Sequence, residues 1–176
     1  MKKILLLALL LMFSCKNNDT VPPTHQSLLA DATANTREAD TIEKYYLEDY
    51  KEFTADIDGD KLLDTVYMVR STINKKYGLK ISYGNKEIDY IGMGTETSGL
   101  GLANLNWVGV MERVDKGRTV WTNLDDNGEF RTDEDTVREN EKVYLHNDAI
   151  YLHAAESCGG GILYRNGEEY AWVVQE

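Results

Sequence analysis

The sequence predicts a mainly β fold, in which a single antiparallel β domain, sandwich- or barrel-like, covers residues 39–176 and includes one short N-terminal helix. Two observations carry this prediction. From Phe53 onward, short runs rich in Val, Ile, Tyr and Trp alternate with Gly, Asn and Asp, which is typical of strands joined by turns. The turn dipeptides Asn147-Asp148 and Asn166-Gly167 separate such runs in the C-terminal third. An α+β fold is the alternative.

Residues 1–14 have the pattern of a signal peptide. Lys2 and Lys3 precede an unbroken apolar run of ten residues, Ile4–Phe13, and the small residue Ser14 follows. Ten helical residues reach only about 15 Å, which is roughly half of a bilayer core. The run is therefore too short to span a membrane.

The cysteine that follows, Cys15, resembles the lipidated cysteine of the lipobox in bacterial lipoproteins. The resemblance implies that Cys15 carries the lipid (palmitate among its acyl chains) as the first residue of the mature chain. It also implies anchoring in the outer membrane of the cell envelope, facing the periplasm or the cell surface. Lys16–Asp19 is similar to the tether of some surface-exposed lipoproteins. An ordinary cleaved signal peptide, with Cys15 incidental, is the alternative.

The segment after Cys15 is predicted to be a flexible tether that ends in a short helix. Residues 15–38 contain no aromatic residue and show no sustained periodicity. Asp40, with a glutamate three residues later, then fits a helix-capping box. Apolar side chains recur every four residues from Ile42 to Tyr50, so we expect a helix over residues 41–50.

The strands and turns of the β domain follow from composition and from hairpin geometry. The predicted strands are residues 65–70, 79–83, 87–91, 105–111 and 119–124. The first turn dipeptide predicts the pairs Leu145–Ile150 and Val143–Leu152; the second predicts Arg165–Glu168 and Leu163–Tyr170, with Gly161 opposite Trp172. Gly161 in that position would let the large ring of Trp172 pack on backbone.

The net charge limits the classes of partner. The chain carries a formal charge of −11, and loss of the signal peptide removes two lysines, which makes it −13. A protein this acidic repels phosphate backbones, so we expect no nucleic-acid partner. The charge favours divalent cations and basic proteins.

The segment DIDGDKLLD, residues 56–64, has the spacing of a calcium loop. Carboxylates at positions 1, 3, 5 and 9 can surround one hard cation, and Ca²⁺ takes six to eight oxygens at about 2.3–2.6 Å. The candidate ligands are Asp56, Asp58, Asp60, the carbonyl of Leu62, and Asp64. Lys61 stands where an EF-hand has glycine, so this is not an EF-hand. A solvated acidic turn, with Lys61 as counter-charge, is the alternative.

This loop and the apolar strand after it resemble the D-x-D-G-D-G-x-x-D loop of FG-GAP repeats in integrin-type propellers. The resemblance implies Ca²⁺ ligation by Asp56, Asp58, Asp60 and Asp64, with Lys61 in place of the second glycine. A fainter copy spans Asp125–Asp133, where an ordinary hairpin turn is the alternative reading. The globular part is too short for a propeller of four blades of about 40 residues each.

No catalytic constellation stands out in the sequence. In the predicted hairpin, His146 and His153 lie about 13 Å apart, which is too far to share one ion. Cys158 precedes three glycines and could act as a thiol nucleophile with His153, but acidic surroundings raise the pKa of a thiol. The glycine-rich stretch at 92–105 has Thr97 where a phosphate-binding G-x-G-x-x-G has its third glycine.

These observations predict a lipid-anchored, Ca²⁺-stabilised, non-enzymatic module that binds another macromolecule, such as an envelope polymer. The alternative is an acidic inhibitor or immunity lipoprotein that docks a basic enzyme, for example a lysozyme-like hydrolase. A hydrolase that uses Cys158 is the third hypothesis.

Overall fold

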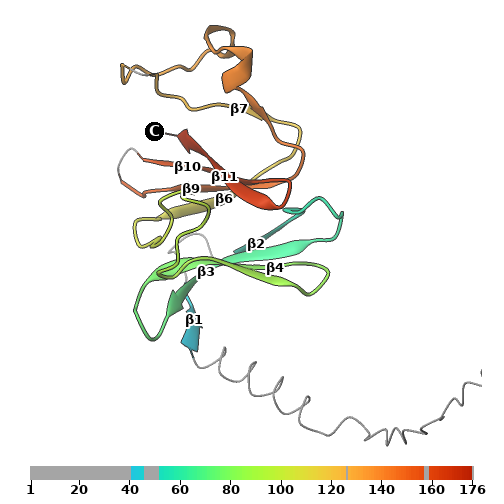
Figure 1. Ribbon diagram of the computed structural model, residues 1–176, viewed down its shortest axis with the longest axis vertical. Coiled ribbons are helices and arrows are strands. Elements are labelled where there is room, and N and C mark those ends of the chain that lie inside the picture. Colours follow the sequence, from blue (N-terminus) through green and yellow to red (C-terminus); the bar gives the residue numbers. More distant parts are fainter. Residues whose placement is uncertain (1–40, 46–51, 126, 157–158, 176) are drawn as a thin grey trace, which may run out of the picture. The chain divides into compact units, whose positions relative to one another are not determined.

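The computed structural model describes residues 41–45, 52–125, 127–156 and 159–175, all within one compact unit, Thr36–Glu176. These residues form a mainly antiparallel β domain, as the sequence predicts (Figure 1). The strands are β1 (Ile42–Lys44), β2 (Glu52–Ala55), β3 (Asp64–Ser71), β4 (Tyr77–Ser82), β5 (Ile88–Gly92), β6 (Val110–Val114), β7 (Thr119–Val120), β8 (Val143–Tyr144), β9 (Ala149–His153), β10 (Gly160–Asn166) and β11 (Glu169–Gln175). Two short 3₁₀ helices are η1 (Glu134–Thr136) and η2 (Glu139–Glu141). In the part of the chain that the structure describes, no helix has the length and hydropathy needed to cross a membrane.

Two antiparallel sheets pack face to face around one core. In the first sheet β1 and β2 both pair with β3, which is followed by β4 and β5, and the second sheet has the order β11-β10-β9-β6. The core contains fully buried side chains from both sheets, including Val66, Met68, Leu79, Ile81, Met111, Ile150, Leu152 and Leu163. In β3, alternate residues such as Val66 and Met68 point inward, as do Leu79 and Ile81 of β4, which is expected for a sandwich.

The second sheet is covered on its other face as well. The short β7-β8 pair lies over it (Figure 1), and Val120 and Leu145 pack with Ile162 and Val173 in a second buried cluster. Because both faces of the sheet are covered, successive residues of β9 and β10 are buried. This is why residues 149–152 and 161–164 are continuously apolar.

The N-terminal helix predicted over residues 41–50 is not observed where the structure describes this segment. Residues 42–44 form strand β1, in which Ile42 pairs with Ser71 and Lys44 with Val69 of β3. Residues 46–50 lie outside the described residues. The unpaired backbone edge of β3 supplies partners that outweigh the local helical pattern.

The predicted hairpin at Asn147-Asp148 is wrong. β8 pairs with β7, whereas β9 pairs with β6 and β10, so the dipeptide joins two different sheets. The Asp148 N–H donates to the carbonyl of Asp56, 3.0 Å away, and not across a hairpin. Tertiary partners for Asp148 therefore override the local turn signal.

The second hairpin exists, with its register shifted by two residues. Arg165 pairs with Tyr170, and Gly161 pairs with Val174 in place of Trp172. A shift of two keeps every side chain on its predicted face. The indole of Trp172 still covers Gly161, because a Cβ there would lie 2.5 Å from two of the ring atoms.

Candidate metal centre

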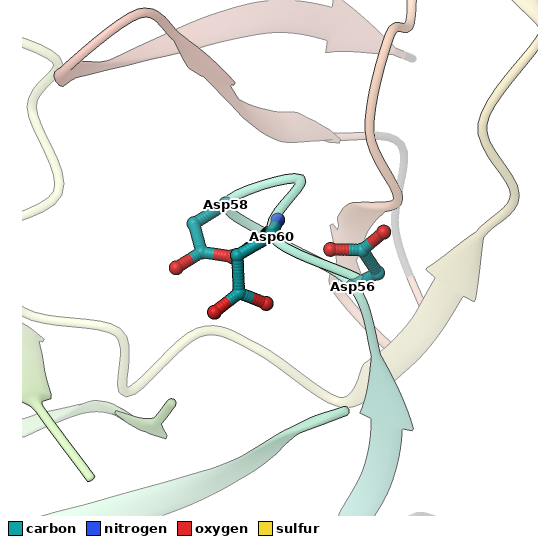
Figure 2. Close-up of side chains that lie close together, drawn as sticks. All are labelled: Asp56, Asp58 and Asp60. Atoms are coloured by element: carbon teal, nitrogen blue, oxygen red, sulfur yellow. Dashed lines mark hydrogen bonds between the residues drawn. The ribbon is translucent and has the colours of Figure 1, made fainter. Parts of the chain in front are cut away.

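The loop between β2 and β3 brings three carboxylates together. Asp56 follows the last residue of β2 and is buried, Asp58 is half-buried, and Asp60 is exposed. One oxygen of each lies within 4.8 Å of the others (Figure 2). Three of the predicted ligands therefore converge on one small volume.

The loop wraps tightly because its own aspartates accept hydrogen bonds from its backbone. The Asp60 N–H donates to Asp58 Oδ1 (3.1 Å), and the Leu62 N–H donates to Asp60 Oδ1 (2.7 Å). The Lys61 N–H donates to Asp56 Oδ1 at 3.2 Å. Such side-chain acceptance is the usual behaviour of Asp in tight turns.

Lys61 takes the backbone conformation that the resembling loops give to glycine. Its φ is +71°, and that of Gly59 is +84°. A side chain in the left-handed region costs about 1–2 kcal/mol. The lysine therefore keeps the turn but stores strain in it.

Asp64, the fourth predicted carboxylate, lies outside this cluster. Its side chain is fully buried, and its two oxygens accept from the N–H groups of Ile57 (2.7 Å) and Gly84 (3.0 Å). Burial raises the pKa of Asp64, and these two hydrogen bonds oppose that rise. Asp64 holds the end of the loop against the turn after β4. Ligation by the carbonyl of Leu62 stays a prediction.

Two residues that the sequence did not connect with this loop, Lys116 and Asp148, tie it to the second sheet. The Lys116 ammonium lies 3.2 Å from Asp56 Oδ2. The Asp148 carboxylate accepts from the N–H groups of Asp56 and Lys116, each at 3.0 Å. Lys116 and Asp148 are 60 and 92 positions from Asp56, so no local pattern could have linked them to it.

The surroundings of Asp148 keep its carboxylate ionised. Burial by itself would raise the pKa of Asp148, but the backbone hydrogen bonds and the nearby Arg113 and Lys116 outweigh burial and lower it. Asp148 is therefore ionised at neutral pH and accepts two N–H groups. Lys116 supplies one positive charge against the cluster, and a hard cation bound by oxygen ligands could balance the rest.

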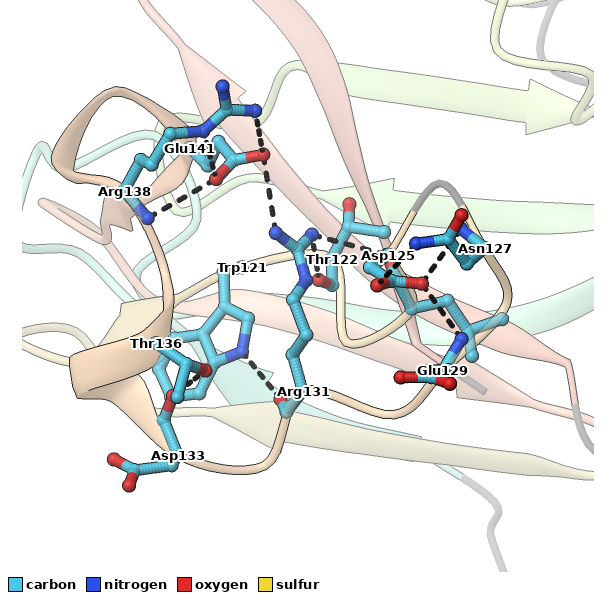
Figure 3. A network of polar contacts seen from close by, with 11 residues as sticks. Trp121, Thr122, Asp125, Asn127, Glu129, Arg131, Asp133, Thr136, Arg138 and Glu141 are labelled. Carbon is cyan, nitrogen blue, oxygen red and sulfur yellow. Dashed lines mark hydrogen bonds and ion pairs between the residues drawn. The ribbon is translucent and has the colours of Figure 1, made fainter.

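The fainter acidic segment is organised as a turn. Asp125 Oδ1 accepts from the N–H groups of Asn127 (2.8 Å) and Glu129 (2.9 Å), and these bonds lower the pKa of Asp125 (Figure 3). Leu124 bridges Phe130 across the turn. The observed bonds fit the hairpin reading, and Asp126 lies outside the described residues.

Arg131 holds the surrounding loop together. Its guanidinium donates to the carbonyls of Thr122 (2.9 Å) and Leu124 (3.1 Å) and to Glu141 (3.2 Å; Figure 3). Hydrogen bonds from Arg138 and Arg131 lower the pKa of Glu141 to about 2. These contacts give the segment a structural role.

The other candidate residues do not assemble into a site among the described residues. His146 packs against Tyr144, and His153 stacks on Tyr151 with its Nδ1 2.6 Å from the carbonyl of Ala154. Cys158 lies outside the described residues, as do residues 1–14 and Cys15. Among the described residues, one set of three acidic side chains lies close enough together to hold a metal ion, namely Asp56, Asp58 and Asp60.

Comparison of the chain with protein-family models, with curated proteins and with solved structures gives no match.

Proposed function

We propose that this chain is a lipid-anchored, non-enzymatic binding module of the bacterial envelope, stabilised by Ca²⁺ held between Asp56, Asp58 and Asp60. The single observation that supports the metal site is that one oxygen of each carboxylate lies within 4.8 Å of the others. Anchoring through Cys15 to the outer membrane rests on the sequence pattern. The module faces the periplasm or the cell surface, where millimolar Ca²⁺ can reach it.

Ca²⁺ at this position would stabilise more than the loop. Asp56 belongs to the loop of the first sheet, and its backbone is paired with Asp148, which precedes β9 of the second. Fixing the loop therefore favours the arrangement in which the two sheets are joined. Loops of extracellular modules bind Ca²⁺ with Kd of about 10⁻⁴–10⁻³ M. At roughly 5 mM Ca²⁺, that affinity contributes about 1–2 kcal/mol to the free energy of unfolding.

The test is the thermal midpoint of the chain without residues 1–14 and with Cys15→Ser, measured in EDTA and in 5 mM Ca²⁺. We expect Ca²⁺ to raise the midpoint by roughly 3–8 °C. Asp58→Asn should abolish the rise. Asp115→Asn is the matched control, because it removes the same charge from an exposed residue beside Lys116. An unchanged midpoint in the parent chain would refute the Ca²⁺ site.

A second candidate is an acidic inhibitor that docks a basic enzyme such as a lysozyme-like hydrolase. The net charge of −11 favours it, as does the exposure of Leu62 (48%) and Leu63 (65%) beside the acidic loop. Capture of such a hydrolase in EDTA that weakens steeply as salt rises from about 50 to about 300 mM would support this function. Over this range the Debye length falls through about 10 Å, so surface charges become screened. Capture that depends on Ca²⁺ would favour the first function.

A further inference from the structure

A hollow of about 420 Å³ opens at the end of β9 opposite the acidic loop. Its described lining comes from the loop that precedes β6 (Leu100, Gly101 and Trp107), from Ala154 after β9, and from Trp172 of β11. Pockets for small ligands measure about 300–1,000 Å³. The hollow therefore has the size of a small-molecule site.

Glycines give the hollow its form. Trp172 lies against Gly161, since a Cβ there would stand 2.5 Å from two ring atoms. Gly160 and Gly101 contribute bare backbone to the wall. The indoles of Trp107 and Trp172 then meet at 82°, with centroids 6.5 Å apart, so the rings form a right-angled aromatic corner.

Acceptors near the hollow are already used. Glu96 Oε1 accepts from the N–H groups of Gly101 (2.7 Å) and Leu102 (3.4 Å), and the carbonyl of Gly159 accepts from the Ala154 N–H (3.1 Å). A ligand rich in N–H groups would lose hydrogen bonds to water and would find these acceptors occupied. A quaternary ammonium group has no N–H and needs no acceptor.

The charge around the hollow favours a cation. The Glu96 carboxylate lies against its wall through the bonds to Gly101 and Leu102. None of the described residues that line the hollow is basic, and the chain carries −11 overall. Indole is the best aromatic partner for a cation placed over its face.

From these observations we infer that the Trp107–Trp172 hollow binds a small quaternary ammonium cation of the choline type. Such a cation carries positive charge without N–H groups, so it matches the indole corner, the nearby carboxylate and the occupied acceptors. The inference is independent of the acidic loop, because the hollow lies at the other end of β9 and shares no residue with the loop.

The test is calorimetric titration of the chain without residues 1–14 and with Cys15→Ser, in EDTA, with choline. We expect saturable binding with Kd on the order of 1 mM, the affinity that two indole contacts supply. The uncharged isostere 3,3-dimethylbutan-1-ol has the same shape and should bind at least about 5-fold more weakly. Equal affinity for choline and the isostere would overturn the inference. Choline binding that does not saturate by about 20 mM, which is about twenty times the expected Kd, would also overturn it.

Variants assign the binding to this hollow. Trp107→Leu should weaken choline binding about 5- to 30-fold, and Glu96→Gln, at an exposed position, by roughly 2- to 5-fold. Glu168→Gln, in the exposed turn after β10, is the matched charge control and should leave Kd unchanged. If Trp107→Leu fails to fold, as judged by its thermal transition, Glu96→Gln decides the outcome. Binding that neither variant changes would overturn the inference.

Two further ligands distinguish between two sources of the quaternary ammonium group. A short peptide with one trimethyllysine tests a protein source, and free choline tests a soluble metabolite. Tighter binding of the peptide would support the inference with a methylated protein as ligand; tighter binding of choline would support it with a metabolite. Failure of both would overturn it.

Discussion

Replacing Asp64 tests whether this residue anchors the loop or ligates a metal. The resemblance to FG-GAP loops implies that Asp64 is a ligand, whereas its two oxygens accept from the N–H groups of Ile57 and Gly84. If Asp64 is an anchor, its loss lowers stability even when no metal is present. If it is a ligand, its loss matters chiefly in Ca²⁺.

The magnitude follows from the two hydrogen bonds. The N–H of Ile57 is buried, and leaving it unpaired costs about 1–3 kcal/mol. Gly84 is exposed, so its N–H can turn to water and its bond contributes only about 0.5–1.5 kcal/mol. Asp64→Ala should therefore lower the free energy of unfolding by roughly 2–4 kcal/mol in EDTA. Asp64→Asn keeps one acceptor and removes a charge whose burial is unfavourable, so it should cost about 1–2 kcal/mol.

The assay is urea unfolding of both variants in EDTA and in Ca²⁺, with Asp58→Asn beside them. With an m-value of about 1.5 kcal/mol/M, Asp64→Ala should lower the urea midpoint by roughly 1–3 M. Asp64→Asn should keep most of the stabilisation by Ca²⁺, whereas Asp58→Asn should lose it and change little in EDTA. An Asp64→Ala variant as stable as the parent chain in EDTA would refute the anchoring role. An Asp64→Asn variant that loses only the response to Ca²⁺ would show that Asp64 is a ligand.

Three further outcomes are expected. Lys116→Met removes the ammonium near Asp56. In EDTA, thermal unfolding should show that the free energy of unfolding falls by at most about 1 kcal/mol, whereas Ca²⁺ should raise the thermal midpoint by more than in the parent chain. An unchanged rise would mean that Lys116 does not compete with the metal. Tyr83→Phe removes a buried hydroxyl that donates to Asp89 (2.8 Å) and lies 2.6 Å from the Tyr170 hydroxyl of the second sheet, and urea unfolding should show a loss of about 1–2 kcal/mol. Because burial raises the pKa of Tyr83, stability should fall as pH rises above about 10, and less so in Tyr83→Phe; identical pH profiles would contradict this. Gly161→Ala pushes a methyl group into the indole ring that covers it, and should lower the thermal midpoint by several degrees, whereas Gly128→Ser, at an open turn, tests left-handed backbone strain alone.

The class of fold was predictable because alternation and turn chemistry are local. The strands predicted at 65–70, 79–83 and 87–91 match β3, β4 and β5 within two residues at each end. The faces of β10 and β11 were also predicted, since a register shift of two preserves them. Strand partners over long separations were not predictable, and β7 and β8 pair across 22 intervening residues.

The candidate site was predictable in part for the same reason. Asp56, Asp58 and Asp60 converge because alternate residues of one tight loop point to one side, which the spacing alone indicates. The roles of Lys116 and Asp148 depend on how the two sheets meet, and the one pattern that includes either residue, the turn dipeptide Asn147-Asp148, does not connect it with the acidic loop. The hollow beside Trp107 is of the same kind, because its walls join segments about 50 to 70 positions apart.

Two of the errors in the local reading occur at the two ends of β9. At one end, Asp148 leaves the predicted hairpin because its carboxylate accepts from Asp56 and Lys116 beside the acidic cluster. At the other end, the predicted strand 105–111 begins only at Val110; the Gly109 N–H donates to the carbonyl of His153, and Trp107 lines the hollow. Native sequences tend to break local rules where a site requires it. Both departures therefore occur where contacts between distant segments override the local signals, at the acidic junction and beside the indole corner.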